Sequence, residues 1–279
     1  MSRLPLSLIV VLVLAASGCG DSDDSTQAAQ TAAAPKAEAP APKPAKAATA
    51  SQYAGPDIAG LYLGMSPDEV KAVLSAYDPA MRVQESSQFF EYSALGKRYK
   101  TERFLVLTQG QMPGGSVVLS AGYTFPPEAP RVVAITRTHR QTSEPLTQAD
   151  YAKALIEKYG TPVEDVKNDR AGAQAERILK WKLPGSGNID CVHSASIGNG
   201  VLDRFVKDGR KMAVETVTPA YAAQCNGVFE YTLRGEPVTQ ANGTLFDVRA
   251  LAKSEFETQA WVQQQVAEKS KTGTQAPKL

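Results

Sequence analysis

Two short segments of this chain carry the same helix-start pattern. In the first, Ser66 has the side chain of an N-cap, and Glu69 stands three residues later, where its carboxylate can accept from the backbone N–H of the cap. In the second, Thr147 and Asp150 hold the same two positions. Apolar residues follow at helical spacing in both, and Gly160 provides a left-handed stop for the second. The pattern predicts two helices about 80 residues apart.

Each predicted helix is followed by segments whose alternation is typical of strands. The expected strands are 88–92, 103–107, 116–125 and 132–139, then 177–183, 202–207, 211–217, 228–233 and 244–248. Turns are expected at 112–115, at Asp208-Gly209 and at Asn242-Gly243. A last helix is expected over 254–269, with Ser254 as its cap and Glu257 at capping-box spacing.

This order predicts an α+β fold made of two units, each a helix plus an antiparallel sheet, with a C-terminal helix at the end. The units are expected over 53–141 and 142–269, arranged as a tandem pseudo-repeat. The alternative is one continuous sheet with the helices packed on one face.

The N-terminus predicts export. A short basic start, an apolar run and small residues precede Cys19, which is the pattern of a bacterial lipoprotein signal peptide over 1–18. The apolar run is too short for a spanning helix. Cys19 is therefore predicted to carry the lipid, and an ordinary secretory signal with an incidental cysteine is the alternative. Gly20 differs from the inner-membrane retention signal, which favours the outer membrane over the inner one, with the protein on the periplasmic side.

The segment from the lipidated Cys19 to residue 52 is rich in Ala, Pro and Lys and has no aromatic residue before position 53. Such a segment cannot bury enough apolar surface to fold, so we expect a disordered tether. Residues 270–279 are polar and are expected to form a disordered tail.

Cys191 and Cys225 remain once the lipidated cysteine is set aside. An even pair in an exported chain predicts a disulfide, worth about 3–4 kcal/mol in the chain-entropy model. The alternative uses Cys191 and His193 as a nucleophile and base, or as metal ligands. No further ligand of the right type lies near in sequence, so we expect neither a metal nor a cofactor.

The segment Gly64-Met65-Ser66-Pro67-Asp68-Glu69-Val70 resembles the helix start of the BamE/SmpA-like family of small envelope lipoproteins. Gly160-Thr161-Pro162 is similar to the Gly-x-Pro that closes helices in that family, and the secreted β-lactamase-inhibitor proteins look like a tandem version of the same unit. The resemblance implies a helix with a three-stranded sheet and a partner in the outer-membrane assembly machinery. The chain departs from the family in its longer loops and its late cysteine pair.

The sequence contains no nucleophile elbow, no His-Glu-x-x-His helix and no phosphate-binding loop, so we expect a protein that is not an enzyme. A net charge of +1 predicts no nucleic-acid partner. Arg137, His139 and Trp181 are the candidate surface contacts, with a strand end and core packing as the alternatives for His139 and Trp181.

These features predict a membrane-tethered, non-catalytic module that binds a protein or takes part in envelope assembly. An inhibitor-like module is the second hypothesis, and it requires an exposed aromatic patch on the sheet. A cell-wall hydrolase is the third, and it requires a cleft with clustered carboxylates or with His139 or His193.

Overall fold

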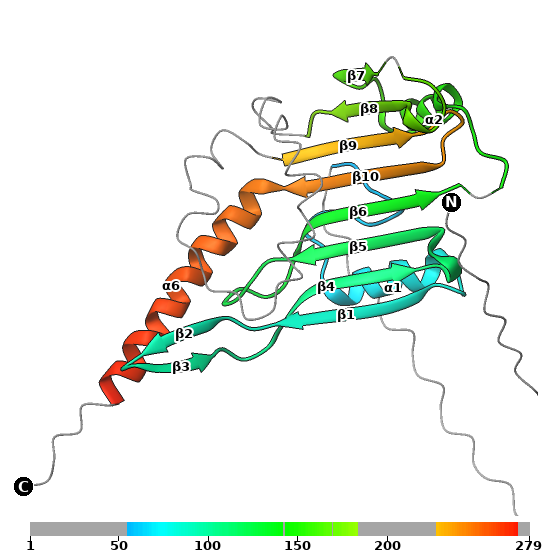
Figure 1. The fold of residues 1–279 in the computed structure, drawn as a ribbon. Helices are drawn as coiled ribbons and strands as arrows, with labels where there is room; N and C mark the ends of the chain where they lie inside the picture. Colours follow the sequence, from blue (N-terminus) through cyan, green and yellow to red (C-terminus); the bar gives the residue numbers. More distant parts are fainter. Residues whose placement is uncertain (1–54, 142, 169, 184–226, 273–279) are drawn as a thin grey trace, which may run out of the picture. The chain divides into compact units, whose positions relative to one another are not determined.

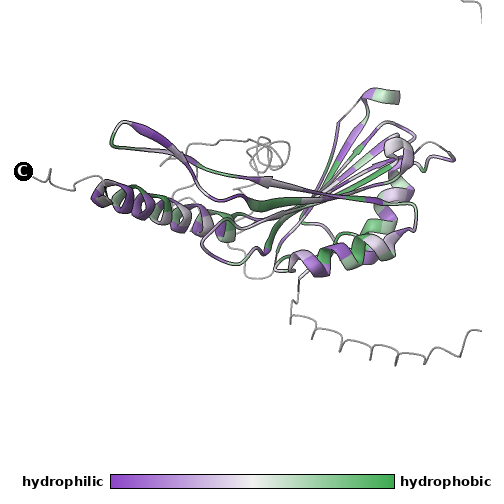
Figure 2. Cartoon of the chain, turned by 90° about the horizontal axis from the view of Figure 1, so that it is seen from below, coloured by the Kyte–Doolittle hydropathy of each residue, from purple (hydrophilic) through white to green (hydrophobic). Residues whose placement is uncertain are grey.

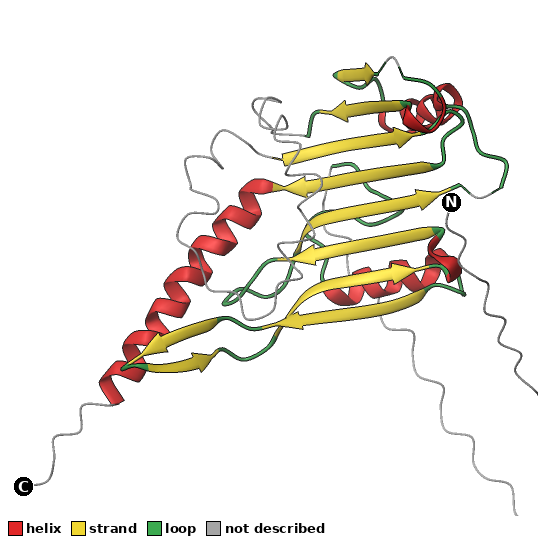
Figure 3. Cartoon of the chain, in the orientation of Figure 1, coloured by secondary structure: helices red, strands yellow, loops and turns green. Residues whose placement is uncertain are grey.

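The computed structural model describes residues 55–141, 143–168, 170–183 and 227–272. In these residues helices and antiparallel strands follow one another in the predicted order, ending in a helix (Figure 3), which confirms the α+β fold class. The leader with Cys19, the tether, the cysteine pair, the strands expected over 202–207 and 211–217, and the Asp208-Gly209 turn all lie outside the described residues.

Eight strands form one antiparallel sheet in the order β1-β4-β5-β6-β10-β9-β8-β7 (Figure 1). They are β1 (Arg82–Gln88), β4 (Phe104–Gln111), β5 (Val117–Tyr123), β6 (Val132–Arg140), β7 (Glu164–Lys167), β8 (Glu176–Trp181), β9 (Gly227–Arg234) and β10 (Gln240–Asp247). A hairpin of β2 (Glu91–Ala94) and β3 (Lys97–Lys100) is inserted between β1 and β4. Short 3₁₀ turns lie at Pro113–Gly115, as the 112–115 turn predicts, and at Gly172–Gln174.

The two halves of the sheet repeat one topology. In the first half a helix is followed by β1, β4, β5 and β6, which run in that order from one edge to the middle of the sheet. In the second half a helix is followed by β7, β8, β9 and β10, which run from the other edge to the middle. The halves meet where β6 pairs with β10. The repeated order of elements therefore lies within one continuous sheet, as in the alternative. The last helix, however, packs on the opposite face of the sheet from the other two.

Both predicted helix starts have the expected caps. Before α1 (Pro67–Tyr77), the Ser66 N–H donates to the Glu69 carboxylate over 2.7 Å, and the Ser66 hydroxyl accepts from the Glu69 N–H over 3.4 Å. Before α2 (Gln148–Tyr159), the Thr147 hydroxyl accepts from the Asp150 N–H over 3.1 Å. Gly160 ends α2 with a φ of 82°. Local side-chain chemistry thus fixes where each helix begins.

One large apolar cluster joins α1 and α2 to the same face of the sheet, which we call the helical face (Figure 2). Its members come from both halves of the chain and include Val70, Leu74, Leu119 and Ile135 from the first half, and Leu155, Leu179, Tyr231 and Leu245 from the second. Because the two halves share this core, neither half buries its own apolar surface alone.

A second apolar cluster fixes the last helix, α6 (Val248–Thr272), which is 25 residues long. Val248, Leu251 and Val262 pack there with Phe125 and Phe246. Toward its C-terminal end α6 becomes mostly hydrophilic (Figure 2) and runs beside β2 (Figure 1). No helix in the described part of the chain combines the length and apolar character needed to span a membrane.

Three sequence predictions are wrong. The last helix starts at Val248, so Ser254 lies inside it, where its hydroxyl accepts from the buried Phe125 N–H over 2.7 Å and caps nothing. Asn242-Gly243 lies inside β10, and the chain instead turns at 235–239. The helix also continues through Thr272, into the range predicted as tail. Ser254 and Gly243 have the local character of a cap and a turn, but each contacts a residue far away in the chain.

Candidate binding face of the sheet

The three central strands change from apolar to polar along the face opposite the helical face. Every second residue of each strand lies on this face, and each row starts with an apolar residue and continues with polar ones. The row on β10 is Phe246, Thr244, Asn242 and Gln240. The rows beside it are Val228, Glu230, Thr232 and Arg234 on β9, and Ala134, Thr136 and Thr138 on β6. Register aligns these rows, so Asn242 pairs with Thr138 on one side and Thr232 on the other. The apolar end lies in the cluster with α6, and the polar end forms a separate surface.

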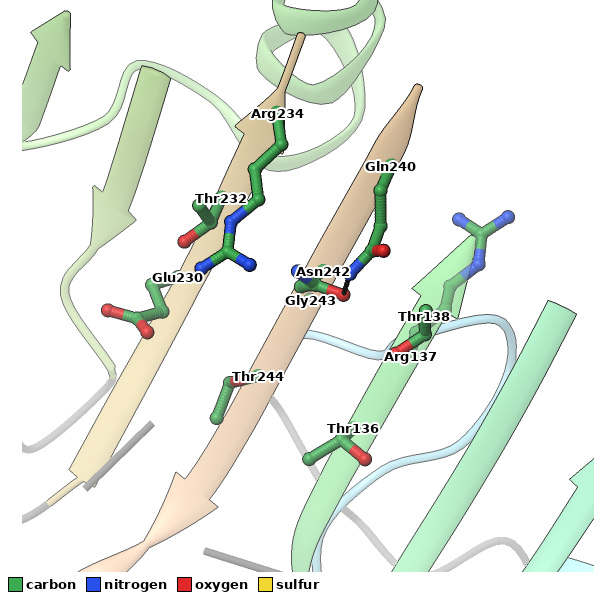
Figure 4. A pocket seen from close by; sticks show the side chains of 10 residues that line it. All are labelled: Thr136, Arg137, Thr138, Glu230, Thr232, Arg234, Gln240, Asn242, Gly243 and Thr244. Atoms are coloured by element: carbon green, nitrogen blue, oxygen red, sulfur yellow. Dashed lines mark hydrogen bonds between the residues drawn. The ribbon is translucent and has the colours of Figure 1, made fainter. Parts of the chain in front are cut away.

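This polar surface surrounds a pocket of about 250 Å³, which we call the polar pocket. Eight side chains line it, as Figure 4 shows: Thr136, Thr138, Glu230, Thr232, Arg234, Gln240, Asn242 and Thr244. Arg137 and Gly243 complete the lining. Because strand residues alternate, the Arg137 side chain belongs to the helical face, and only its backbone faces the polar pocket.

Three of the pocket's side chains make hydrogen bonds to neighbours on the strands. The Gln240 amide donates to the Asn242 side-chain oxygen over 2.9 Å (Figure 4), and Arg234 donates from Nε to the Glu176 carboxylate over 3.2 Å. All eight residues sit on strands of the central ladder, not on loops, so the lining is rigid.

Glu230 is the one carboxylate of the pocket lining. Burial raises its pKa, while the nearby Lys180 lowers it and Glu164 raises it. Lys180 itself pairs with Glu164 over 2.8 Å. These three residues face one another across β7, β8 and β9, so a row of alternating charge borders the neutral hydroxyl and amide groups.

Arg137 and His139, two of the predicted contacts, lie together on the helical face. His139 Nδ1 is 3.3 Å from the Tyr151 hydroxyl of α2. Burial lowers the His139 pKa, and the charge of Arg137 lowers it further. The Arg137 Nε is buried and has no hydrogen-bond partner. Both side chains are half-buried beneath α2, so they do not form one surface with the polar pocket.

Trp181, the third predicted contact, is 7% exposed and belongs to the shared core. Its ring packs on Tyr159 and Phe229, and its indole N–H donates to the Gly160 carbonyl at the end of α2 over 2.8 Å. These contacts agree with the core-packing alternative. The indole joins the helix to the sheet and leaves little surface for a partner.

A second pocket, of about 470 Å³, lies where the start of α6 meets the β5–β6 connection. Two of its charged residues form an ion pair, with Lys253 3.0 Å from Glu128, and Lys253 is also 3.4 Å from Glu257 on α6. Asp247 accepts the Ala250 N–H there, and burial raises its pKa. Its polar groups are thus used to hold α6, whereas the polar pocket carries several neutral groups free of such a structural task.

The described residues contain no cluster of three or more His, Cys, Asp or Glu side chains placed to hold a metal ion. What the polar pocket offers is a set of hydroxyl and amide donors and acceptors on rigid strands, flanked by one guanidinium and one carboxylate. Such a set recognises a ligand through directed hydrogen bonds.

The sequence analysis missed the polar pocket, although a signal for it exists. Strand residues 228–234 alternate apolar and polar, which by itself predicts only a half-buried strand. The sequence does not give the register of β10 against β9 and β6, and only this register brings the polar residues of the three strands onto one surface.

Comparison of the chain with known protein families, curated proteins and solved structures returns no match. The resemblance to the BamE/SmpA-like family therefore stays a prediction.

Proposed function

We propose that this chain is a lipoprotein tethered on the periplasmic side of the bacterial envelope, in the outer membrane, where it acts as a non-catalytic binding module. Cys19 carries the lipid, the Ala/Pro/Lys-rich segment sets the reach, and the polar pocket makes the contact. The observation that supports this most is the aligned row of hydrogen-bonding side chains on β6, β10 and β9.

The partner is an envelope protein. A rigid polar strand surface suits directed hydrogen bonds to the backbone and side chains of another protein, as in the polar parts of transient interfaces. The polar pocket is small, about 250 Å³, so the tether contributes by raising the local concentration of the module near partners in the same envelope.

Photo-crosslinking in cells tests the contact. Probes at positions 138 and 232 report on the polar pocket, and a probe at Lys153, exposed on α2, serves as the control. We expect a discrete protein adduct from the pocket positions and none from position 153. Equal adducts at all three positions, or none from folded and lipidated protein, would contradict the proposal.

A matched pair of variants separates the contact from the fold. Thr138→Val is read with the probe at position 232, and Thr232→Val with the probe at position 138. Each variant removes one hydroxyl from a half-buried strand position, so we expect normal folding with a weaker adduct. Lipidation is tested separately by fatty-acid labelling, which Cys19→Ala abolishes if Cys19 is the anchor.

The two other hypotheses have weaker support. The inhibitor-like module requires an exposed aromatic patch on the sheet, and the ten residues that line the polar pocket include no aromatic side chain. The hydrolase requires clustered carboxylates or a histidine in a cleft. Glu230 is the only such group in the lining of the polar pocket, and retention of phenotype in Glu230→Gln and His139→Ala cells would remove this hypothesis.

A further inference from the structure

The tip of the β2–β3 hairpin holds an exposed leucine in a backbone conformation that leucine rarely adopts. Leu95 and Gly96 form the two-residue turn, with φ angles of 50° and 72°. Turns with two positive φ angles favour Asn-Gly, because a branched side chain is strained there. Leu95 is nevertheless present, and its side chain is 57% exposed. Strain that persists at a surface position points to a function for that side chain.

Cations follow this apolar tip along β3. Lys97, Arg98 and Lys100 follow directly, all exposed, and no acidic residue lies between Leu95 and Lys100. Lys100 lies over the Phe89 ring at 4.4 Å and only 3.9 Å from Glu91, its cross-strand neighbour. The hairpin end is therefore both apolar and strongly basic.

The last helix supports the hairpin and adds to its charge. Tyr92 and Tyr99 stack across the two strands with ring centroids 5.6 Å apart, and α6 runs beside β2 (Figure 1). Lys269 of α6 lies over the Tyr99 ring at 5.7 Å, and Lys271 follows on the same helix. The tip is thus presented on a supported hairpin next to further cations.

We propose that the β2–β3 hairpin is a docking element for the surface of an anionic lipid bilayer, with Leu95 entering the headgroup region and the lysines and Arg98 binding lipid phosphates. Exposed apolar residues flanked by Lys and Arg are the combination that binds such surfaces, since the apolar group is buried while the cations meet the anionic headgroups. A nucleic-acid or acidic-protein ligand would account for the cations but not for the strained, exposed leucine. This inference is independent of the polar pocket.

Flotation with vesicles tests the docking element. The mature chain from residue 19 onward, with Cys19→Ser to remove the predicted lipid, is mixed with vesicles of phosphatidylcholine alone or of phosphatidylcholine with phosphatidylglycerol. We expect binding to the anionic vesicles that weakens as salt is added, and much less binding to the neutral ones. Equal binding to both vesicle types would overturn the proposal, whatever segment causes it.

Three variants locate the binding. Lys97→Glu with Arg98→Glu should lower the partition onto anionic vesicles at least about tenfold. Lys153→Glu with Lys167→Glu makes the same change in net charge on α2 and β7, at the other edge of the sheet, and should leave binding within about twofold. Equal losses in the two charge variants would mean that only net charge matters and would overturn the assignment to the hairpin.

Leu95→Asn separates binding from folding. Asparagine suits the left-handed turn position, so the variant should unfold at the same or a higher temperature than the parent chain. The same variant should bind anionic vesicles several-fold more weakly, because the apolar tip is gone. Unchanged binding in Leu95→Asn would show that the leucine does not enter the bilayer and would overturn the proposal.

Discussion

Gly243 on β10 and Tyr231 on β9 are cross-strand partners, and the tyrosine ring covers the glycine. A Cβ atom at position 243 would lie 2.7 Å from two carbons of the ring. Tyr231 is fully buried and is stacked against Tyr159 at 5.9 Å, so the ring has little room to move. Gly243 thus lets the Tyr231 ring lie close to the β10 backbone in the core, and it forms no turn.

Gly243→Ala is therefore expected to destabilise the protein by about 1–3 kcal/mol, the usual cost of overpacking. Chemical denaturation measures the change. In a Tyr231→Leu background the same substitution should cost less, because the ring is gone, and the difference gives the coupling between the two positions. An equal cost in both backgrounds would show that the glycine serves its own backbone and not the ring.

Ser254→Ala removes the acceptor of the buried Phe125 N–H, which joins α6 to the strand region 129 residues earlier. We expect a loss of about 1–3 kcal/mol, since a buried donor loses its partner. Ser270→Ala is the matched control, because the Ser270 hydroxyl only donates to the Val266 carbonyl within the same helix. Thermal unfolding of both variants compares them, and equal effects would mean that the contact to Phe125 adds nothing.

The lowered pKa of His139 predicts that the protein loses stability in mild acid. Its folded pKa is lowered below 6.5 by burial and by Arg137, so the unfolded chain takes up the proton first as the pH falls. The free energy of unfolding therefore decreases as the pH falls from about 6.5 toward the folded pKa. His139→Asn, which retains a polar group near the Tyr151 hydroxyl, should flatten the pH profile between about 7.5 and 5.5. If His139→Asn leaves the pH profile of the unfolding free energy unchanged, a group other than His139 causes the loss of stability.

The raised pKa of Glu230 predicts the opposite dependence of stability on pH from that of His139. Its folded pKa is raised above 4.5, mainly by burial, so its contribution to stability is present in acid and is lost as the pH rises through the folded pKa. Glu230→Gln lacks this titration. The melting temperature of the variant relative to the parent should thus be more favourable at neutral pH than at about pH 4. A difference that does not change with pH would show that the carboxylate is not perturbed by its surroundings.

The sequence by itself determined the local features of this fold. Ser66 with Glu69, Thr147 with Asp150, and Gly160 mark the helix ends because capping uses groups within one turn of each other. The α+β class and the repeated order of helix and strands follow from such local signals and from side-chain periodicity. Arg137 and His139 lie on one side of β6, because alternation is a property of the strand alone.

Only the tertiary structure decided which distant segments meet. The pairing of β6 with β10 joins the two halves into one sheet, and it aligns Thr138, Asn242 and Thr232 into a single polar row. The same assembly places Gly243 against Tyr231 and Ser254 against Phe125, so residues that have the local character of a turn and a cap serve the core. Register and packing depend on contacts between residues far apart in the chain, and local sequence patterns do not encode those contacts.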